Sequence, residues 1–361
     1  MKHYLSTGWL ILLLSACSGS MKDNGNSELL IIPVDVAQNS PVRLSEISDD
    51  IKKIELETSD ECLIKRIVQV VCNGNRIFVL DAQAGMRIHV FDLSGKFIYA
   101  IDRRGQGPGE YIYIQNITAD PQNNHIYINP GIKKLIRYDQ EGHFIDEFTT
   151  IDGLIQYIRF ENDLLYVFCE EFGRPIAEGM TANITNMIGY KRDWQPVDTL
   201  MVNKVILHGT IGTSVPNLEI MSQDDQNNVF VYCPYFAYEP LVRDTLYVLD
   251  KNRLKPYAKL KFSDENSSHK KNINSILRTS NLLIAEFFRI SEKEKQYFCY
   301  DFRSKTGKTM TGGFLDDVHD TGLAEIRLLN NRYFYFWKEA EDLSPSEEEP
   351  NPTLYIGKLK D

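Results

Sequence analysis

The sequence lacks the signatures of two common protein classes. Apart from residues 5–14 it has no long apolar run, so it predicts no transmembrane helix in the mature chain. It also lacks an excess of basic residues: its 361 residues include 40 Lys and Arg against 50 Asp and Glu, a formal net charge of −10. Nucleic-acid-binding proteins usually carry a basic stripe, so this balance argues against one.

Cysteine is scarce, and its spacing fits neither a disulfide framework nor a metal site. Five cysteines follow Cys17, an odd number, and no CxxC motif occurs. Cys62 and Cys72 bracket a predicted strand that would hold them roughly 30 Å apart, beyond disulfide reach. We therefore expect buried thiols at most of the five positions, which are Cys62, Cys72, Cys169, Cys233 and Cys299.

Catalytic motifs are absent as well. The sequence has no GxSxG elbow, no calcium loop with EF-hand spacing, and no HxH or HxxxH pair. Its remaining histidines are scattered along the chain, at His89, His125, His143, His208, His269 and His319. The sequence therefore predicts no catalytic residue, no metal ligand set and no cofactor.

What is present begins with an export signal. A basic start, Lys2 and His3, precedes the apolar residues 5–14 and the sequence Ser15-Ala16-Cys17. This pattern predicts a signal peptide over residues 1–16. Its end resembles a bacterial lipobox, which implies that Cys17 is diacylated and that residues 17–40 form a flexible tether. An ordinary signal peptide with an incidental cysteine is the alternative.

Residues 18–22 bear on the side of the membrane. They lack the acidic run expected of a surface-export signal. This favours a lipid-anchored protein of the outer membrane that faces the periplasm, and it leaves surface exposure open.

Helical periodicity is scarce, whereas short apolar runs recur about every fifty residues. Their starts are separated by 49, 39, 64, 53 and 51 residues, and a polar turn precedes nearly every run. Such a recurrence is typical of a β-propeller or another repeat array. The six runs are Ile77–Asp81, Ile126–Asn129, Leu165–Phe168, Val229–Tyr232, Leu282–Phe287 and Tyr333–Trp337.

Each repeat contains four predicted strands, the number in a propeller blade. In the first repeat, tight turns at 73–75 and 92–96 join consecutive strands. The last repeat lacks a fourth strand, while Ile51–Glu57 alternates like a strand and has no other partner. The sequence thus predicts an all-β, six-bladed propeller of four-stranded antiparallel blades over residues 41–361, closed by an N-terminal strand.

Several of these segments also resemble a known family. The strand Ile51–Glu57, the run IFVLD, residues 90–101 (VFDLSGKFIYAI) and residues 103–111 (RRGQGPGEY) look like the six-bladed β-propeller lipoproteins of Bacteroidetes, which are similar to NHL-repeat propellers. The resemblance implies the fold and a location in the cell envelope. It implies no catalytic activity.

The connections predict which face of the ring carries function. The loops between second and third strands, for example Glu170–Ile188, and the links between blades, for example 201–217, are long and lie on one face. Binding residues concentrate on such loops of a rigid scaffold. Nine residues there are candidates for ligand binding: Arg87, Arg103, Arg104, Glu110, Tyr111, Tyr235, Phe236, Tyr238 and Arg243.

Each candidate group also has a structural interpretation. The glycines of residues 105–111 can cradle an anion through backbone N–H groups, but strands flank this run, and a phosphate loop needs a following helix. A tight link between blades is the favoured interpretation. Tyr235, Phe236 and Tyr238 can stack on a sugar or anchor a protein, or they can pack over the rim of the ring.

These features favour a non-enzymatic lipoprotein, expected to be monomeric, that binds a glycan, a peptide or an envelope protein through the long-connection face. A propeller lyase or hydrolase with a metal in the central channel is the alternative. A sensor or assembly subunit of an outer-membrane transporter is a third hypothesis.

Overall fold

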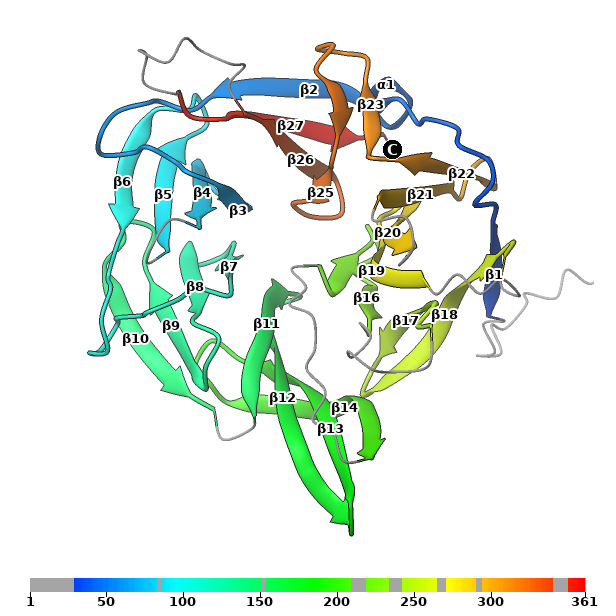
Figure 1. Ribbon diagram of the computed structural model, residues 1–361. Coiled ribbons are helices and arrows are strands. Elements are labelled where there is room, and N and C mark those ends of the chain that lie inside the picture. The colour runs from blue at the N-terminus through cyan, green and yellow to red at the C-terminus, as the bar shows by residue number, and fades with distance from the viewer. Residues whose placement is uncertain are drawn as a thin grey trace, which may run out of the picture.

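The computed structural model of the protein describes residues 29–82, 86–150, 153–208, 219–233, 242–264, 271–289, 294–339 and 350–360. Six β-sheets stand around a common axis, each with its first strand innermost (Figure 1). This is the predicted all-β, six-bladed propeller. Among the described residues the one helix is α1 (Leu44–Ile47), and no helix there is long and apolar enough to span a membrane.

The blades follow the chain in order. Blade 1 contains β3 (Ile67–Asn73), β4 (Arg76–Asp81), β5 (Arg87–Asp92) and β6 (Phe97–Ile101); blade 2 contains β7 (Asn116–Asp120), β8 (His125–Asn129), β9 (Lys134–Tyr138) and β10 (Phe144–Thr149). Blade 3 contains β11 (Leu154–Glu161), β12 (Leu164–Ala177), β13 (Met180–Tyr190) and β14 (Pro196–His208); blade 4 contains β15 (Met221–Gln223), β16 (Val229–Tyr232), β17 (Thr245–Asp250) and β18 (Arg253–Phe262).

Blade 5 contains β19 (Lys271–Arg278), β20 (Leu282–Arg289), β21 (Lys295–Asp301) and β22 (Thr306–Thr311). Blade 6 contains β25 (Arg327–Leu328), β26 (Tyr333–Lys338), β27 (Thr353–Leu359) and β2 (Ser48–Glu55). A short hairpin of β23 (Phe314–Asp316) and β24 (Gly322–Ala324) lies between these two blades in the chain.

All six apolar runs found in the sequence are second strands of blades. A second strand has sheet neighbours on both sides, and the adjacent blades cover both of its faces. The residues of β16, for example, are all buried. Because both faces are buried, the second strands are continuous apolar runs rather than alternating ones. This makes them the easiest strands to recognise in the sequence.

The predicted N-terminal strand closes the ring. β2 pairs antiparallel with β27, with Ile54 opposite Leu354 and Lys52 opposite Ile356. Ile51 packs in a cluster with residues of blades 5 and 6, whereas Ile54 packs with Cys62, Phe91 and other residues of blades 1 and 6. This one strand therefore seals the last blade against both of its neighbours.

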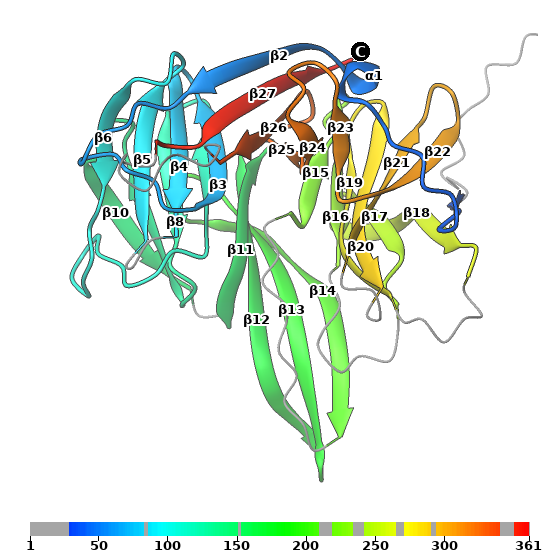
Figure 2. The ribbon, with the colours of Figure 1, turned by 45° about the horizontal axis from the view of Figure 1, so that its top comes forward.

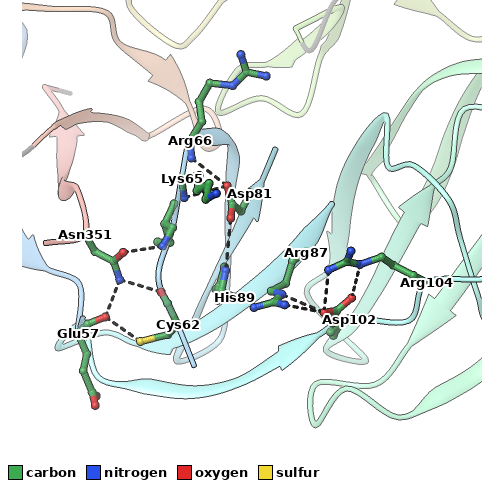
Figure 3. A network of polar contacts seen from close by, with 12 residues as sticks. Glu57, Cys62, Lys65, Arg66, Asp81, Arg87, His89, Asp102, Arg104 and Asn351 are labelled. Carbon is green, nitrogen blue, oxygen red and sulfur yellow. Dashed lines mark hydrogen bonds and ion pairs between the residues drawn. The ribbon is translucent and has the colours of Figure 1, made fainter. Parts of the chain in front are cut away.

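Asn351 reinforces the junction between the last and first blades (Figure 3). Its Nδ2 donates to the carbonyls of Glu57 and Cys62, at 2.7 and 2.9 Å, and its Oδ1 accepts from the backbone N–H of Ile64 at 2.7 Å. One amide thus satisfies three backbone groups of the segment that leads into blade 1. Leaving such buried groups unpaired would cost about 1–3 kcal/mol each.

A fully buried Asp81–His89 pair lies close to this junction (Figure 3). Asp81 Oδ1 accepts from the backbone N–H groups of Lys65 and Arg66, and Oδ2 lies 3.7 Å from Nε2 of His89. Burial acts to raise the pKa of Asp81, but the interaction with His89 and the hydrogen bonds from the backbone outweigh it and hold the pKa below its usual value. The pair fastens the entry of blade 1 to β4 and β5.

Polar side chains also tie neighbouring blades together near the axis. Gln69 in blade 1 donates to the carbonyl of Ile117 in blade 2 and accepts from its N–H. Asn116 in blade 2 makes the same pair of bonds to Ile158 in blade 3. Each amide side chain thereby makes the two bonds that a paired strand would make, since the described strands of adjacent blades do not pair with each other.

One expectation for the N-terminus is wrong in part. Residues 17–40, predicted to be a tether, include β1 (Leu30–Val34), which pairs parallel with β18 as a fifth strand of blade 4. Ile32 and Val34 are almost completely buried there. The chain then passes the outer edge of blade 5, where Ser40 N–H donates to Thr309, and reaches β2 (Figure 1). β1 was missed because it stands outside the repeat.

The expected loop Glu170–Ile188 is also wrong. These residues belong almost entirely to β12 and β13, which meet in a tight hairpin after Ala177. The expected link 201–217 begins as the second half of β14. As a result blade 3 projects well beyond the ring (Figure 2).

The five cysteines after Cys17 are free thiols, and all but the partly buried Cys72 are buried. The expectation of buried thiols is therefore confirmed. Burial raises the pKa of Cys72 to about 12, so this thiol stays protonated and unreactive near neutral pH.

The closure predicts a large effect of Ile54→Ala. Removing a side chain that is 3% exposed and packs between two blades should lower the free energy of unfolding by about 2–4 kcal/mol. Lys53→Ala is the matched control on the exposed face of β2 and should cost less than about 1 kcal/mol, because its ion pair with Glu55 is exposed. Urea unfolding of both variants measures the difference, and equal effects would contradict the role of Ile54.

Candidate functional site

The two faces of the ring differ in their connections. Short turns join first to second strands and third to fourth strands on one face, here called the short-turn face. The connections between second and third strands and between blades lie on the opposite, long-connection face. The projection of blade 3 extends from the long-connection face, since it ends at the β12–β13 hairpin (Figure 2).

Two predicted ligand-binding arginines share one carboxylate on this face (Figure 3). Arg87 Nη2 lies 2.8 Å from Asp102 Oδ2, and Arg104 Nε lies 3.0 Å from Asp102 Oδ1. Burial opposes the effect, but the hydrogen bonds and charges of both arginines hold the pKa of Asp102 below its usual value. A ligand would therefore compete with Asp102 for these guanidinium groups.

The other residues of the link between blades 1 and 2 are engaged within the link. Glu110 accepts from the N–H of Gly107 at 2.9 Å, and the buried Tyr111 donates its hydroxyl to the carbonyl of Ile101 at 2.9 Å. Arg103 pairs through its carbonyl with the N–H of Tyr111. Gly109 has φ +71°, and a Cβ there would lie 2.6 Å from the ring of Phe144. The geometry is that of a tight crossover, the favoured interpretation.

The predicted aromatic residues Tyr235, Phe236 and Tyr238 lie outside the described residues, as does Cys17. Arg243, from the same insert, is described. Its Nη2 donates to Asn203 Oδ1 on β14 at 2.8 Å, and its carbonyl accepts from the hydroxyl of Tyr232 at 3.0 Å. Arg243 thus fastens blade 4 to the blade 3 projection.

The projection exposes apolar side chains. The distal half of β14 alternates strictly: Asn203, Val205 and Leu207 are buried, whereas Lys204, Ile206 and His208 are exposed. Ile206 is 49% exposed, and Met201, on the same side of the strand, is 57% exposed. One side of β14 therefore faces the protein, and the other presents aliphatic groups to solvent.

The structure also shows a site that was missed from the sequence, a cavity of about 170 Å³ on the axis of the ring. Residues from the innermost strands or strand ends of all six blades line it, among them Gln69, Thr118, Arg159, Glu219, Leu277 and Arg327. Several of them belong to the ends of first strands, which lie toward the short-turn face. The cavity is therefore distinct from the predicted long-connection site.

Charged side chains of both signs meet in this axial cavity. Arg159 Nε lies 2.8 Å from Glu161 Oε1, and Arg159 Nη2 reaches across the axis to the carbonyl of Leu329 in blade 6 at 3.2 Å. Arg327 Nη1 donates to the carbonyl of Val68 at 2.6 Å. In the sequence, the one indication of this cavity is the charged pair Arg159 and Glu161 within the mainly apolar strand β11.

Glu219 is the unusual carboxyl of the cavity. Burial raises its pKa to about 7, although the charge of Arg327 and a hydrogen bond from the backbone of Leu328 act against the shift. The charge of Glu286 adds to the increase. Glu219 therefore changes its ionisation near neutral pH, in a cavity whose arginines stay protonated.

None of the described histidines lines the axial cavity. His89 is buried in β5, and His143 lies exposed in a turn beside Asp139. Within the described ranges, no three or more His, Cys, Asp or Glu side chains are grouped so that they could hold a metal ion.

The pKa of Glu219 predicts a pH dependence of stability. The native state binds this proton more tightly than the unfolded chain, whose value is near 4.5. The free energy of unfolding should therefore fall as the pH rises from about 4.5 to about 7, by at most about 1.4 kcal/mol per pH unit. Urea unfolding at several pH values should show this decrease in the wild type relative to Glu219→Gln; parallel curves would contradict it.

A solved structure of a protein described as exported, from Bacteroides fragilis, is 18% identical and has a TM-score of 0.64; the match covers 92% of this chain and all of that one. A member of the DUF4221 family from Bacteroides vulgatus is 10% identical with a TM-score of 0.46, over 87% of this chain and 97% of that one. No curated protein matches the sequence.

A family model covers nearly the whole described chain. The model of DUF4934, a domain of unknown function, matches residues 29–361 and so includes β1, the closing strand β2 and all six blades. The chain therefore belongs to the DUF4934 family.

Proposed function

We propose that the protein is a binding module of the cell envelope that contacts a partner protein through the blade 3 projection. The observation that carries this proposal is the length of β12, β13 and β14, which have 14, 11 and 13 residues. The second strands of blades 1 and 2 have only six and five. A rigid ring that holds one extended sheet away from its face is suited to presenting that sheet to another molecule.

The outer edge of β14 supports a protein partner. Among the described residues no strand pairs with this edge, whereas β1 covers part of the other long outer strand, β18. A long edge with unpaired backbone groups is a template for strand addition. Met201 and Ile206 add aliphatic contacts, which suit a protein surface better than a sugar.

The location rests on the N-terminus. The signal-peptide pattern and the lipobox support export and lipid attachment at Cys17. The similar Bacteroides fragilis protein, described as exported, agrees with an extracytoplasmic location. Attachment to the outer membrane, facing the periplasm, is part of the same proposal, as is the likeness to NHL-type propeller lipoproteins.

The enzyme hypothesis predicts a bound metal. Elemental analysis of the purified full chain separates it from the binding proposal, because a stoichiometric metal would favour a lyase or hydrolase. A glycan ligand is a further alternative, and a glycan-array screen tests it.

Photo-crosslinking in intact cells tests the projection. A photoreactive residue at Met201 or Ile206 should give one discrete protein adduct. The matched control is Ile145, which is 38% exposed on the outer strand β10 of blade 2 and should give none. Ile206→Asp should reduce the Met201 adduct at least severalfold. Absence of an adduct, or equal adducts at Ile145, would contradict the proposal.

A further inference from the structure

The axial cavity is separate from the proposed partner surface and has its own chemistry. Two arginines and two glutamates line it: Arg159, Arg327, Glu161 and Glu219. Its volume of about 170 Å³ equals that of roughly six water molecules. A ligand that fills it therefore has only about six to nine non-hydrogen atoms.

The balance of charge excludes a simple anion. Glu286, whose charge acts on Glu219, is held by Asn274 and Tyr297 behind the cavity wall. With it, three carboxyl groups face two arginines. When Glu219 is ionised, an anion would enter surroundings that already hold excess negative charge, and partly buried charge without compensation is costly.

The presence of both signs of charge favours a ligand with two charged ends. Arg327 brings a planar guanidinium group, the geometry that best matches a carboxylate, and Arg159 brings a second, for which a ligand carboxylate would compete with Glu161. Glu161 and Glu219 offer carboxylate oxygens in the same small space, which suit an ammonium group. We infer that the axial cavity binds a small zwitterion of the α-amino acid class, its carboxylate toward the arginines and its ammonium toward the glutamates.

The affinity of the axial cavity for such a ligand should depend on pH through Glu219. The groups that act on it from other strands are Arg159, Arg327 and Glu286, together with tyrosines whose own pKa values are raised, Tyr157, Tyr297 and Tyr335. These tyrosines are neutral near pH 7. With a pKa of about 7, Glu219 is mostly ionised at pH 8 and mostly neutral at pH 6. An ammonium group prefers the ionised form, so binding should be about tenfold tighter at pH 8.

Calorimetric titration of the full chain in detergent tests the inference with matched probes. L-alanine carries both charges, L-lactate lacks the ammonium, alaninol lacks the carboxylate, and glycerol lacks both. Alanine should bind saturably and at least about tenfold more tightly than the other three. Equal or tighter binding of lactate, alaninol or glycerol would overturn the inference, as would no saturable binding of alanine up to about 10 mM.

Variants test the residues. Arg159→Lys should weaken alanine binding about tenfold, because it removes the guanidinium fork. Glu219→Gln should reduce the affinity at pH 8 to the value at pH 6 or below it and remove the pH dependence. Arg303→Lys is the control, an arginine paired with Asp301 on the outer part of blade 5, and should bind like the wild type. A reversed pH dependence, or unchanged binding in both cavity variants, would overturn the inference. The probe series uses the wild type, so it decides even if a variant fails to fold.

Discussion

The pairing of the first blade-forming strand, β2, with the last, β27, is the constraint on which the rest of this structure depends. Apart from bonds across the axis such as Arg159 to Leu329, each sheet packs against its two neighbours around the ring, so a ring left open would expose two complete sheet faces to water. β2 prevents this because Ile51 faces one neighbouring blade and Ile54 the other. Every third residue of the strand is buried, and because residues three apart on a strand point to opposite faces, the buried side chains alternate between the two neighbouring blades.

Closure also forces six first strands to converge on one axis. Their side chains meet there without the backbone pairing that joins strands within a blade. Side-chain hydrogen bonds replace that pairing. Gln69 and Asn116 bond to the backbone of the next blade, and Arg159 bonds across the ring to the carbonyl of Leu329. The axis is therefore polar although the spaces between blades are apolar, and a site on it is built from residues of several blades.

Much of the fold could be predicted because its signals are local. The buried second strands, such as Ile77–Asp81, stand out as apolar runs after polar turns, and β2 lacked any other partner. β1 gave no such signal, since its position is fixed only by a contact with β18, more than 200 residues away. The sequence predicts a loop where β12 and β13 extend, because Gly173 and Pro175 interrupt the strand pattern. Both residues lie at irregularities of the β12–β13 pairing.

The candidate sites were less predictable than the fold. The sequence indicated Arg104 beside the glycine-rich link and Arg87 at the entry of a strand as candidates, but it did not show that Asp102 binds both. Arg159, Glu219 and Arg327 lie between 60 and 168 residues apart in the chain and acquire meaning only when the ring brings them together. Residues that converge through topology alone leave no motif.

The N-terminal segment that runs around the rim has a kinetic consequence. β1 and β2 are synthesised first, yet their partners β18 and β27 are among the later strands, and β27 is the last of all. Such long sequence separations slow the search for the native pairing. Until β18 and β27 have been synthesised, β1 and β2 remain without partners and compete for any free sheet edge. Closure of the ring is therefore among the last pairings to form, because it needs the final strand of the chain, and until then the unpaired strands favour aggregation.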